Sequence, residues 1–320
     1  CNHTTTHGGV MLFQETSDSW TGGLLYPVMV SSTVYLTAGF VLLWNSGFIG
    51  AEYGLPFTGP LTLLFWRYWA LTGILLIYLR LRGRLFWPGF YDASIALLVG
   101  FLAHGVWLGC VLFSLQQGVP AGIVALVVAL QPMLTGALSG PVVGEHTPLT
   151  RWFGLFVGFC GVILAVGART NPNDAGSVFG YFIPFGSVIG ITAASLLQRY
   201  IEVHGRAHRL PLDISLFYQS LATALAATLP AIGLESLATR WEPTFISTML
   251  WLILGVSLAA YALMWLLLSR LDATRVASLF YLGPPVTMIM AWIAFGDTLQ
   301  STDVIGLVIV AAGVVVVQRQ

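Results

Sequence analysis

Long apolar runs separated by short polar connections are the main pattern of this chain. Ten runs are long enough to be considered as membrane spans, because about 20 apolar residues in a helix cross a bilayer core of about 30 Å. The pattern therefore predicts an all-α integral membrane protein with ten transmembrane helices. The expected spans cover residues 32–54, 60–80, 93–115, 119–143, 150–168, 178–200, 212–234, 244–268, 273–295 and 301–317.

The expected tail before the first run covers residues 1–31, and its stretch from Cys1 to about Tyr26 is polar and rich in Gly, Thr and Ser. It has neither the basic n-region nor the small-residue cleavage site of a secretory signal peptide. His3 and His7 could in principle chelate a metal, but a disordered tail is the simpler interpretation. We expect no metal site and no cofactor.

Composition supports the membrane assignment and limits the kinds of molecule that the protein can bind. Apolar residues make up 57% of the 320 positions and charged residues only 8%, and the mean hydropathy is +0.85. A soluble domain carries roughly 25% charged residues, so most of this chain must face lipid or other helices. The formal net charge is zero, which excludes the basic surface of a nucleic-acid-binding protein. The expected partners are the lipid bilayer and a small-molecule substrate.

The arginines predict the orientation, since basic residues accumulate on the cytoplasmic side. With the N-terminus inside, ten of the thirteen arginines fall on the cytoplasmic side, two outside (Arg169 and Arg240) and one within a span (Arg67). We therefore expect a multi-pass protein of the cytoplasmic (inner) membrane with both termini in the cytoplasm. The inside set is Arg80, Arg82, Arg84, Arg151, Arg199, Arg206, Arg209, Arg270, Arg275 and Arg319.

An internal repeat emerges when the chain is shifted by 152 positions. Twelve of the 45 positions in 121–165 are then identical to their counterparts in 273–317, more than compositional bias explains. The matches include Pro132 with Pro284 and Gly144 with Gly296, and Glu145 falls on Asp297.

The repeat predicts two units, residues 32–168 and 178–317, each with five spans. Because five is odd, the second unit enters the membrane upside down. Inverted repeats around a central cavity are the architecture by which many secondary transporters achieve alternating access, so a transporter is favoured over a structural bundle.

Several segments resemble the drug/metabolite transporter superfamily in its EamA-like branch, and the likeness extends over residues 32–317. The matching segments are Leu43–Gly50, Pro60–Thr62 with Arg67, Pro120–Gly122 through Leu130–Pro132 to Gly144–Glu145, and the second copy Asp272–Thr274 through Gly283–Pro284 to Gly296–Asp297. The resemblance implies a ten-helix exporter with a cavity between the repeats. Family members export amino acids, aromatic ones among them, and other small metabolites.

The resemblance also bears on assembly. Glycines recur in the fifth and tenth spans, among them Gly154, Gly161, Gly306 and Gly313, and small residues let helices approach closely. Similar pairs in the family contribute to dimer contacts. In this chain, packing within one monomer explains the glycines equally well. Both a monomer and a homodimer stay open.

Prolines at equivalent positions in the middle of spans point to the binding site, since interrupted helices expose polar backbone to a cavity. The interruptions are Pro132 in the first repeat and Gly283, Pro284 and Pro285 in the second. Aromatic rings and neutral polar groups at the same depth suit a small amphiphile or zwitterion. The expected cavity residues are Trp44, Asn45, His104, Trp107, Gln131, Ser195, Gln198, Tyr261, Trp265 and Tyr281.

Ionisable groups within the spans need a reason, because they are costly in lipid. Glu52 is the expected partner of Arg67, in a buried ion pair that joins the first two spans. The alternative is that Arg67 holds an anionic substrate. His104 is either a hydrogen-bonded packing residue or a functional one that binds substrate or carries a coupling proton. No span has Asp or Glu near its middle, which favours facilitated diffusion or exchange unless His104 carries a proton.

Other functions fit the pattern less well. A membrane enzyme needs a constellation of catalytic groups at one depth, and His104 has no acidic neighbour on its span. A channel needs a polar pore, and a nucleotide-sugar carrier needs several basic groups where only Arg67 is available. The main hypothesis is an exporter of amino acids or related amphiphiles, and the alternative is a carrier of another metabolite or drug.

Overall fold

A computed structural model describes the backbone of residues 22–144, 146, 148–169, 175–205, 210–271 and 273–318. Side chains are described for the same residues except 22–32, 175–177, 273–274, 277 and 317–318. Most of the predicted tail lies outside the described residues, as do Glu145, Arg206, Arg209, Asp272 and Arg319.

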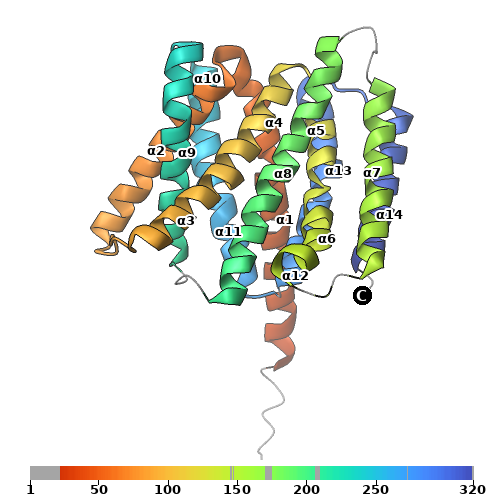
Figure 1. Cartoon of the computed structure of the whole chain (residues 1–320), viewed down its shortest axis with the longest axis horizontal. Coiled ribbons are helices and arrows are strands. Elements are labelled where there is room, and N and C mark those ends of the chain that lie inside the picture. Colours follow the sequence, from red (N-terminus) through yellow and green to blue (C-terminus); the bar gives the residue numbers. More distant parts are fainter. Residues whose placement is uncertain are drawn as a thin grey trace, which may run out of the picture.

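The described chain is a helical bundle without a β-strand (Figure 1). The first unit contains α1 (Gly22–Gly54), η1 (Leu55–Phe57), α2 (Pro60–Leu81), α3 (Phe90–Gly100), η2 (Phe101–Val106), α4 (Trp107–Gln116), α5 (Ala121–Val128), α6 (Gln131–Val143) and α7 (Leu149–Arg169). The second contains α8 (Ala175–His204), α9 (Leu212–Glu235), α10 (Pro243–Leu250), η3 (Trp251–Ala260), α11 (Tyr261–Leu268), α12 (Ala273–Ser278), η4 (Leu279–Leu282), α13 (Gly283–Phe295) and α14 (Ser301–Gln318).

Eight helical stretches of the described chain are long and apolar enough to cross a membrane. They correspond to the first eight predicted spans. The ninth and tenth predicted spans correspond to two shorter apolar helices, Leu279–Phe295 and Ser301–Val316. Helix α1 begins at Gly22, inside the stretch expected to be a tail, and its first turns extend below the bundle (Figure 1). Helix α14 ends at the same end of the bundle.

Two predicted spans are broken at their middle rather than kinked. The span that contains Pro132 is interrupted after α5, and α6 starts at Gln131 with the proline in its first turn. The second copy has the short helices α12 and η4, and α13 then starts at Gly283, again with proline in its first turn. Proline is tolerated there because the first N–H groups of a helix have no partner within the helix.

The same two helices also end alike. Gly144 follows α6 with φ 86°, and Gly296 follows α13 with φ 74°. Glycine adopts this left-handed conformation without the steric cost of a Cβ, which is why it ends many helices. The repeat detected in the sequence is therefore reproduced in local backbone conformation.

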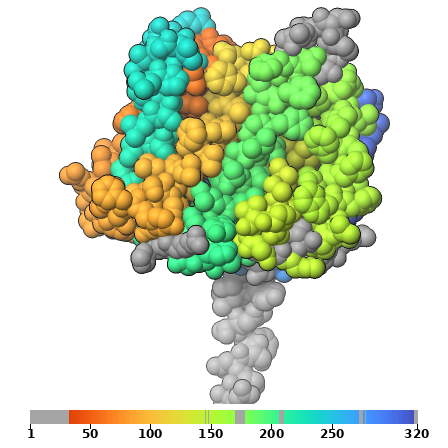
Figure 2. All heavy atoms as spheres, viewed as in Figure 1, coloured from red at the N-terminus to blue at the C-terminus, as the bar shows by residue number. Residues whose placement is uncertain are grey.

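Side-chain burial is that of a protein surrounded by lipid. Large apolar side chains face outward, Leu229 being 80% and Ile293 72% exposed. Buried positions include polar and charged residues such as Arg67, His104 and Thr287. On the face seen in Figure 2, side chains of α3, α8 and α7 form a packed outer layer.

Candidate functional site

A cavity of about 380 Å³ lies inside the bundle and is bordered by elements of both units. We call it the chamber. The first unit contributes residues of α1, α3, η2, α4, α5 and α6, and the second contributes residues of α8, α9, α11, η4 and α13. A chamber of this size accommodates a small organic molecule.

Nine of the ten residues expected at the cavity line the chamber. Tyr281 is the exception. It lies in η4 and packs against the hydrophobic core, because the short 3₁₀ segment turns the neighbouring Phe280 toward the chamber instead. Pro132, Gly283 and Pro284 also line the chamber, whereas Pro285 does not. The nine are Trp44, Asn45, His104, Trp107, Gln131, Ser195, Gln198, Tyr261 and Trp265.

Aromatic rings form one wall of the chamber, with Trp44 of α1 at their centre. Its ring centroid lies 5.3 Å from that of Tyr261 and 6.4 Å from that of Trp107. Phe280, which the sequence reading did not single out, lies 5.1 Å from Trp44 in an edge-to-face arrangement. Rings at these distances pack favourably with one another and present flat apolar faces to a ligand.

Three polar side chains form a hydrogen-bonded cluster where α9 meets η2. His104 Nε2 lies 3.1 Å from Gln219 Oε1, and Gln219 Nε2 donates to Ser215 Oγ at 2.9 Å. With the amide in this orientation, His104 Nε2 is the donor. Gln219 and Ser215 line the chamber and were missed by the sequence reading. Their i, i+4 spacing on one face of an apolar span was the available signal.

Neutral side chains also mark the two helix breaks. The Asn45 side chain accepts a hydrogen bond from Thr287 Oγ1 at 3.1 Å and donates to Val41 O at 2.7 Å. A Cβ on Gly283 would lie 3.1 Å from Asn45 Oδ1, so glycine lets α13 approach α1 here. At the other break, Gln131 Nε2 donates to Thr135 Oγ1 at 3.2 Å.

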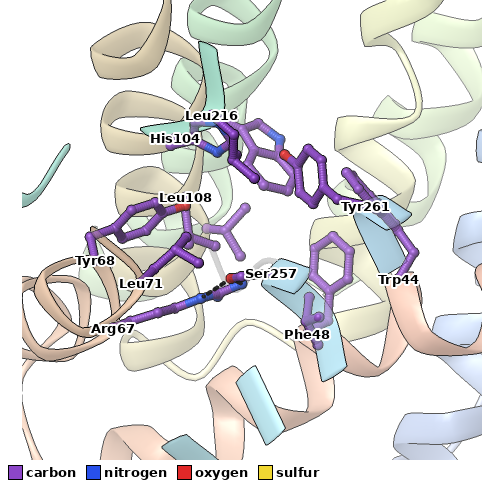
Figure 3. A pocket seen from close by; sticks show the side chains of 14 residues that line it. Trp44, Phe48, Arg67, Tyr68, Leu71, His104, Leu108, Leu216, Ser257 and Tyr261 are labelled. Atoms are coloured by element: carbon purple, nitrogen blue, oxygen red, sulfur yellow. Dashed lines mark hydrogen bonds between the residues drawn. The ribbon is translucent and has the colours of Figure 1, made fainter. Parts of the chain in front are cut away.

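A smaller space of about 40 Å³ continues inward from the chamber. We call it the inner recess. Its lining includes Arg67 and Tyr68 of α2 and Ser257 of η3. Arg67 Nε and Nη2 both donate to Ser257 Oγ, at 3.1 and 2.9 Å. Figure 3 shows the guanidinium reaching Ser257, with Tyr68 on one side and Tyr261 on the other.

The prediction that Glu52 and Arg67 form an ion pair is wrong. At the level of Glu52, α1 packs against α13 rather than turning toward Arg67. Neighbouring Tyr53 contacts Phe295 with ring centroids 4.7 Å apart, and the carboxylate within electrostatic reach of Glu52 is Asp297. Glu52 Oε2 is buried without a hydrogen-bond partner among the described residues.

Asp297 lies in the connection between α13 and α14, outside the spanning helices. Its Oδ2 is also buried without a described hydrogen-bond partner. Burial raises the pKa of the Asp297 carboxyl, and the Arg169 guanidinium partly opposes that rise. Arg169 itself pairs with Asp303, its Nε donating to Oδ1 at 2.9 Å, which ties α7 to α14.

Two segments of π-helix position the groups that face the interior. His104 belongs to η2 and Ser257 to η3. A π-helical turn contains an extra residue, and such turns often occur at functional sites. The 152-residue shift places residues 101–106 on 253–258, within η3. The hydropathy pattern gave no sign of either segment.

A bundle of apolar helices long enough to cross a membrane, with an internal chamber, is typical of membrane transporters. The EamA-like transporter family model matches the chain twice, at residues 31–167 and 178–319. This chain belongs to that family, and the resemblance stated from the sequence is confirmed. The family also indicates a transporter rather than an enzyme.

Curated relatives agree with this assignment. The chain is 26% identical to the uncharacterized inner membrane transporter YedA of Escherichia coli, over 86% of this chain and 87% of that one. It is 25% identical to a probable amino-acid metabolite efflux pump of Salmonella typhimurium, over 87% and 92%. An uncharacterized transporter of Archaeoglobus fulgidus is 28% identical over 89% and 97%.

A solved structure described as "Crystal structure of protein" shares the fold. Its TM-score is 0.58 with 19% sequence identity, over 90% of this chain and 96% of that one.

Proposed function

We propose that this chain is a secondary transporter that exports amino acids or related small amphiphiles across the cytoplasmic membrane. It works by alternating access between two inverted five-helix repeats. The observation that carries the proposal is the chamber, which both repeats border with aromatic rings and neutral amides.

The inverted arrangement is supported by several equivalences between the units. The family model matches each unit separately. The breaks before α6 and α13, the left-handed glycines that end these helices and the π-helical segments all recur at corresponding positions. Units of five spans each must have opposite orientations in the membrane, and repeats of this kind support alternating access.

The chamber extends toward the end of the bundle that carries the predicted cytoplasmic connections. Gln198 near the end of α8, Leu212 at the start of α9 and Trp265 near the end of α11 all line it. The inner recess continues in the opposite direction. With the N-terminus in the cytoplasm, this arrangement is an inward-facing state.

Hydrogen bonds between the two repeats close the end of the bundle that lies away from the predicted cytoplasmic connections. Glu235, at the end of α9, accepts from the backbone N–H groups of Leu61 and Thr62, at 3.2 and 2.7 Å. Thr58 Oγ1 donates to Ala238 O at 2.9 Å, and Arg240 Nη2 donates to Pro56 O at 2.8 Å. We propose that these contacts rearrange when the carrier opens outward.

The chamber wall supports the substrate class. Rings around Trp44 provide apolar contact area, and Asn45, Gln131 and Gln198 provide hydrogen-bonding groups without fixed charge. The Salmonella relative, named a probable amino-acid metabolite efflux pump, supports amino acids or their derivatives.

Reconstitution tests the proposal directly. Purified protein in proteoliposomes is supplied with labelled neutral and aromatic amino acids, with and without an imposed pH gradient. Saturable flux that does not need the gradient is the expected result and identifies a facilitator or exchanger. Flux that requires the gradient would point to a proton site and direct attention to His104. Absence of flux for every amino acid would overturn the amino-acid assignment.

A further inference from the structure

Arg67 is the most deeply buried cationic group among the described side chains. Only 5% of the residue is exposed, and it lies in the second turn of α2 within the bundle. Placing a charged side chain in the membrane interior costs about 2.5–3.5 kcal/mol on insertion scales. A buried charge of this kind needs a partner in the protein or in a ligand.

The protein supplies only partial compensation. Ser257 Oγ accepts two hydrogen bonds from the guanidinium, and the Tyr68 ring centroid lies 5.8 Å from Arg67 Cζ. A hydroxyl and a ring face carry no net negative charge. Among the described residues, no carboxylate forms an ion pair with Arg67, and none of the residues lining the chamber or the inner recess is Asp or Glu.

The guanidinium lines the inner recess, directly beside the chamber. Six residues line both spaces, so the inner recess adjoins the chamber and the same side chains separate or connect the two. They are Trp44, Phe48, His104, Trp107, Leu216 and Tyr261. The recess volume of about 40 Å³ suits a small planar head group, whereas the chamber is large enough for the body of a ligand.

We propose that Arg67, held in place by Ser257, is the carboxylate-binding subsite of this transporter. A guanidinium offers several N–H donors in a planar fork that matches a carboxylate. The substrate is then a monocarboxylate whose uncharged apolar or aromatic body lies against Trp44, Trp107 and Tyr261. This inference rests on the proposed function, because it takes the chamber as the substrate site.

The charge distribution also defines what is excluded. An amino group in the chamber meets amide and hydroxyl oxygens but no carboxylate. The carboxylate is therefore the group that is recognised, and the amino group is dispensable. A cationic analogue without a carboxylate is repelled by the guanidinium.

Three probes separate these features: L-phenylalanine, N-acetyl-L-phenylalanine and L-phenylalaninamide. In proteoliposomes containing the full chain, we expect saturable flux of the first two and none of the amide. Arg67→Gln is expected to lower the flux of both carboxylates roughly tenfold to hundredfold, mainly through KM, as expected for loss of one partner of a buried charge pair. Arg67→Lys, which keeps the charge but loses the fork, is expected to be intermediate.

Arg84→Gln is the matched control. Arg84 is half exposed and forms an ion pair with Asp213 at 2.9 Å. Neither residue lines the chamber or the inner recess, and this variant is expected to transport like the wild type. Should Arg67→Gln fail to fold, Arg67→Lys and the wild-type preference for acid over amide still test the subsite.

Two outcomes overturn the carboxylate subsite alone: wild-type flux of the amide equal to that of the acids, or carboxylate flux in Arg67→Gln within twofold of wild type. Absence of flux for all three probes in the wild type would overturn the proposed function together with the subsite, so the two failures are distinguishable.

Discussion

Gly161 of α7 and Gly306 of α14 meet so closely that a Cβ on either residue would lie 2.6 Å from the carbonyl oxygen of the other. A Cβ on Gly313 would likewise lie 2.6 Å from Gly154 O. The sequence allowed two interpretations of these glycines, contacts in a dimer or packing within one chain. In the structure they pack α7 against α14 of the same chain. They join the fifth predicted span to the tenth and so connect the two repeats.

Gly306→Ala is expected to destabilise the protein. The new methyl group would lie 2.6 Å from Gly161 O and 2.9 Å from Ala165 Cβ, so the two helices must separate, and overpacking of this kind costs about 1–3 kcal/mol. Thermal unfolding of the detergent-solubilised protein measures the effect. Gly167→Ala on α7 is the control, because no atom of the described residues lies within 4 Å of its Cβ position. Equal melting temperatures for Gly306→Ala and wild type would show that α7 and α14 do not pack as described.

Glu235→Ala is expected to weaken the closed end of the bundle. The Glu235 carboxylate caps α2 through the N–H groups of Leu61 and Thr62 and lies at the positive end of the helix dipole. Loss of such a cap costs about 1 kcal/mol, which lowers the melting temperature. Glu242→Ala removes a carboxylate that is 53% exposed and is expected to change little. A melting temperature as high in Glu235→Ala as in Glu242→Ala would contradict the capping role.

Trp107→Ala and Gln131→Ala test whether chamber residues contact the substrate. Removal of the Trp107 ring opens the aromatic wall beside Trp44, and we expect flux to fall roughly tenfold or more, as for an anchoring side chain in a binding site. Trp292→Ala is the control for the tryptophan, since Trp292 is 56% exposed on the outside of α13. Gln116→Ala, at an exposed position, is the control for the glutamine. Full flux in both variants would show that the chamber is not the substrate site.

The spans and most of the chamber wall could be predicted because they depend on local properties. Hydropathy identifies a lipid-facing helix from its own residues, and polar or aromatic groups in mid-span, such as Trp44 and Gln131, have few places to lie except an interior cavity. The repeat also placed the helix breaks, since Pro132 and Pro284 interrupt equivalent runs.

Contacts between distant helices could not be predicted in the same way. Arg67 bonds to Ser257, 190 positions away, and this contact depends on how α2 packs against η3. The expected pairing with Glu52 used charge and depth but not the direction in which each side chain leaves its helix. The π-helical segments were also invisible, because hydropathy does not distinguish a π-helical turn from an α-helical one.

Asp297→Asn is expected to stabilise the protein at pH 7.5. Burial raises the pKa of the Asp297 carboxyl above its ordinary value of 3.8, so ionisation is less favourable in the folded state than in the unfolded chain. The contribution to stability is then fully present below the unfolded pKa and is lost as the pH rises through the folded pKa. Asparagine does not titrate and avoids this loss. The melting temperature of Asp297→Asn relative to wild type, measured in detergent between pH 4 and 7.5, should therefore show a gain that is largest at pH 7.5 and shrinks toward pH 4. A difference that stays constant over this range would mean that the Asp297 carboxyl titrates alike in the folded and unfolded states.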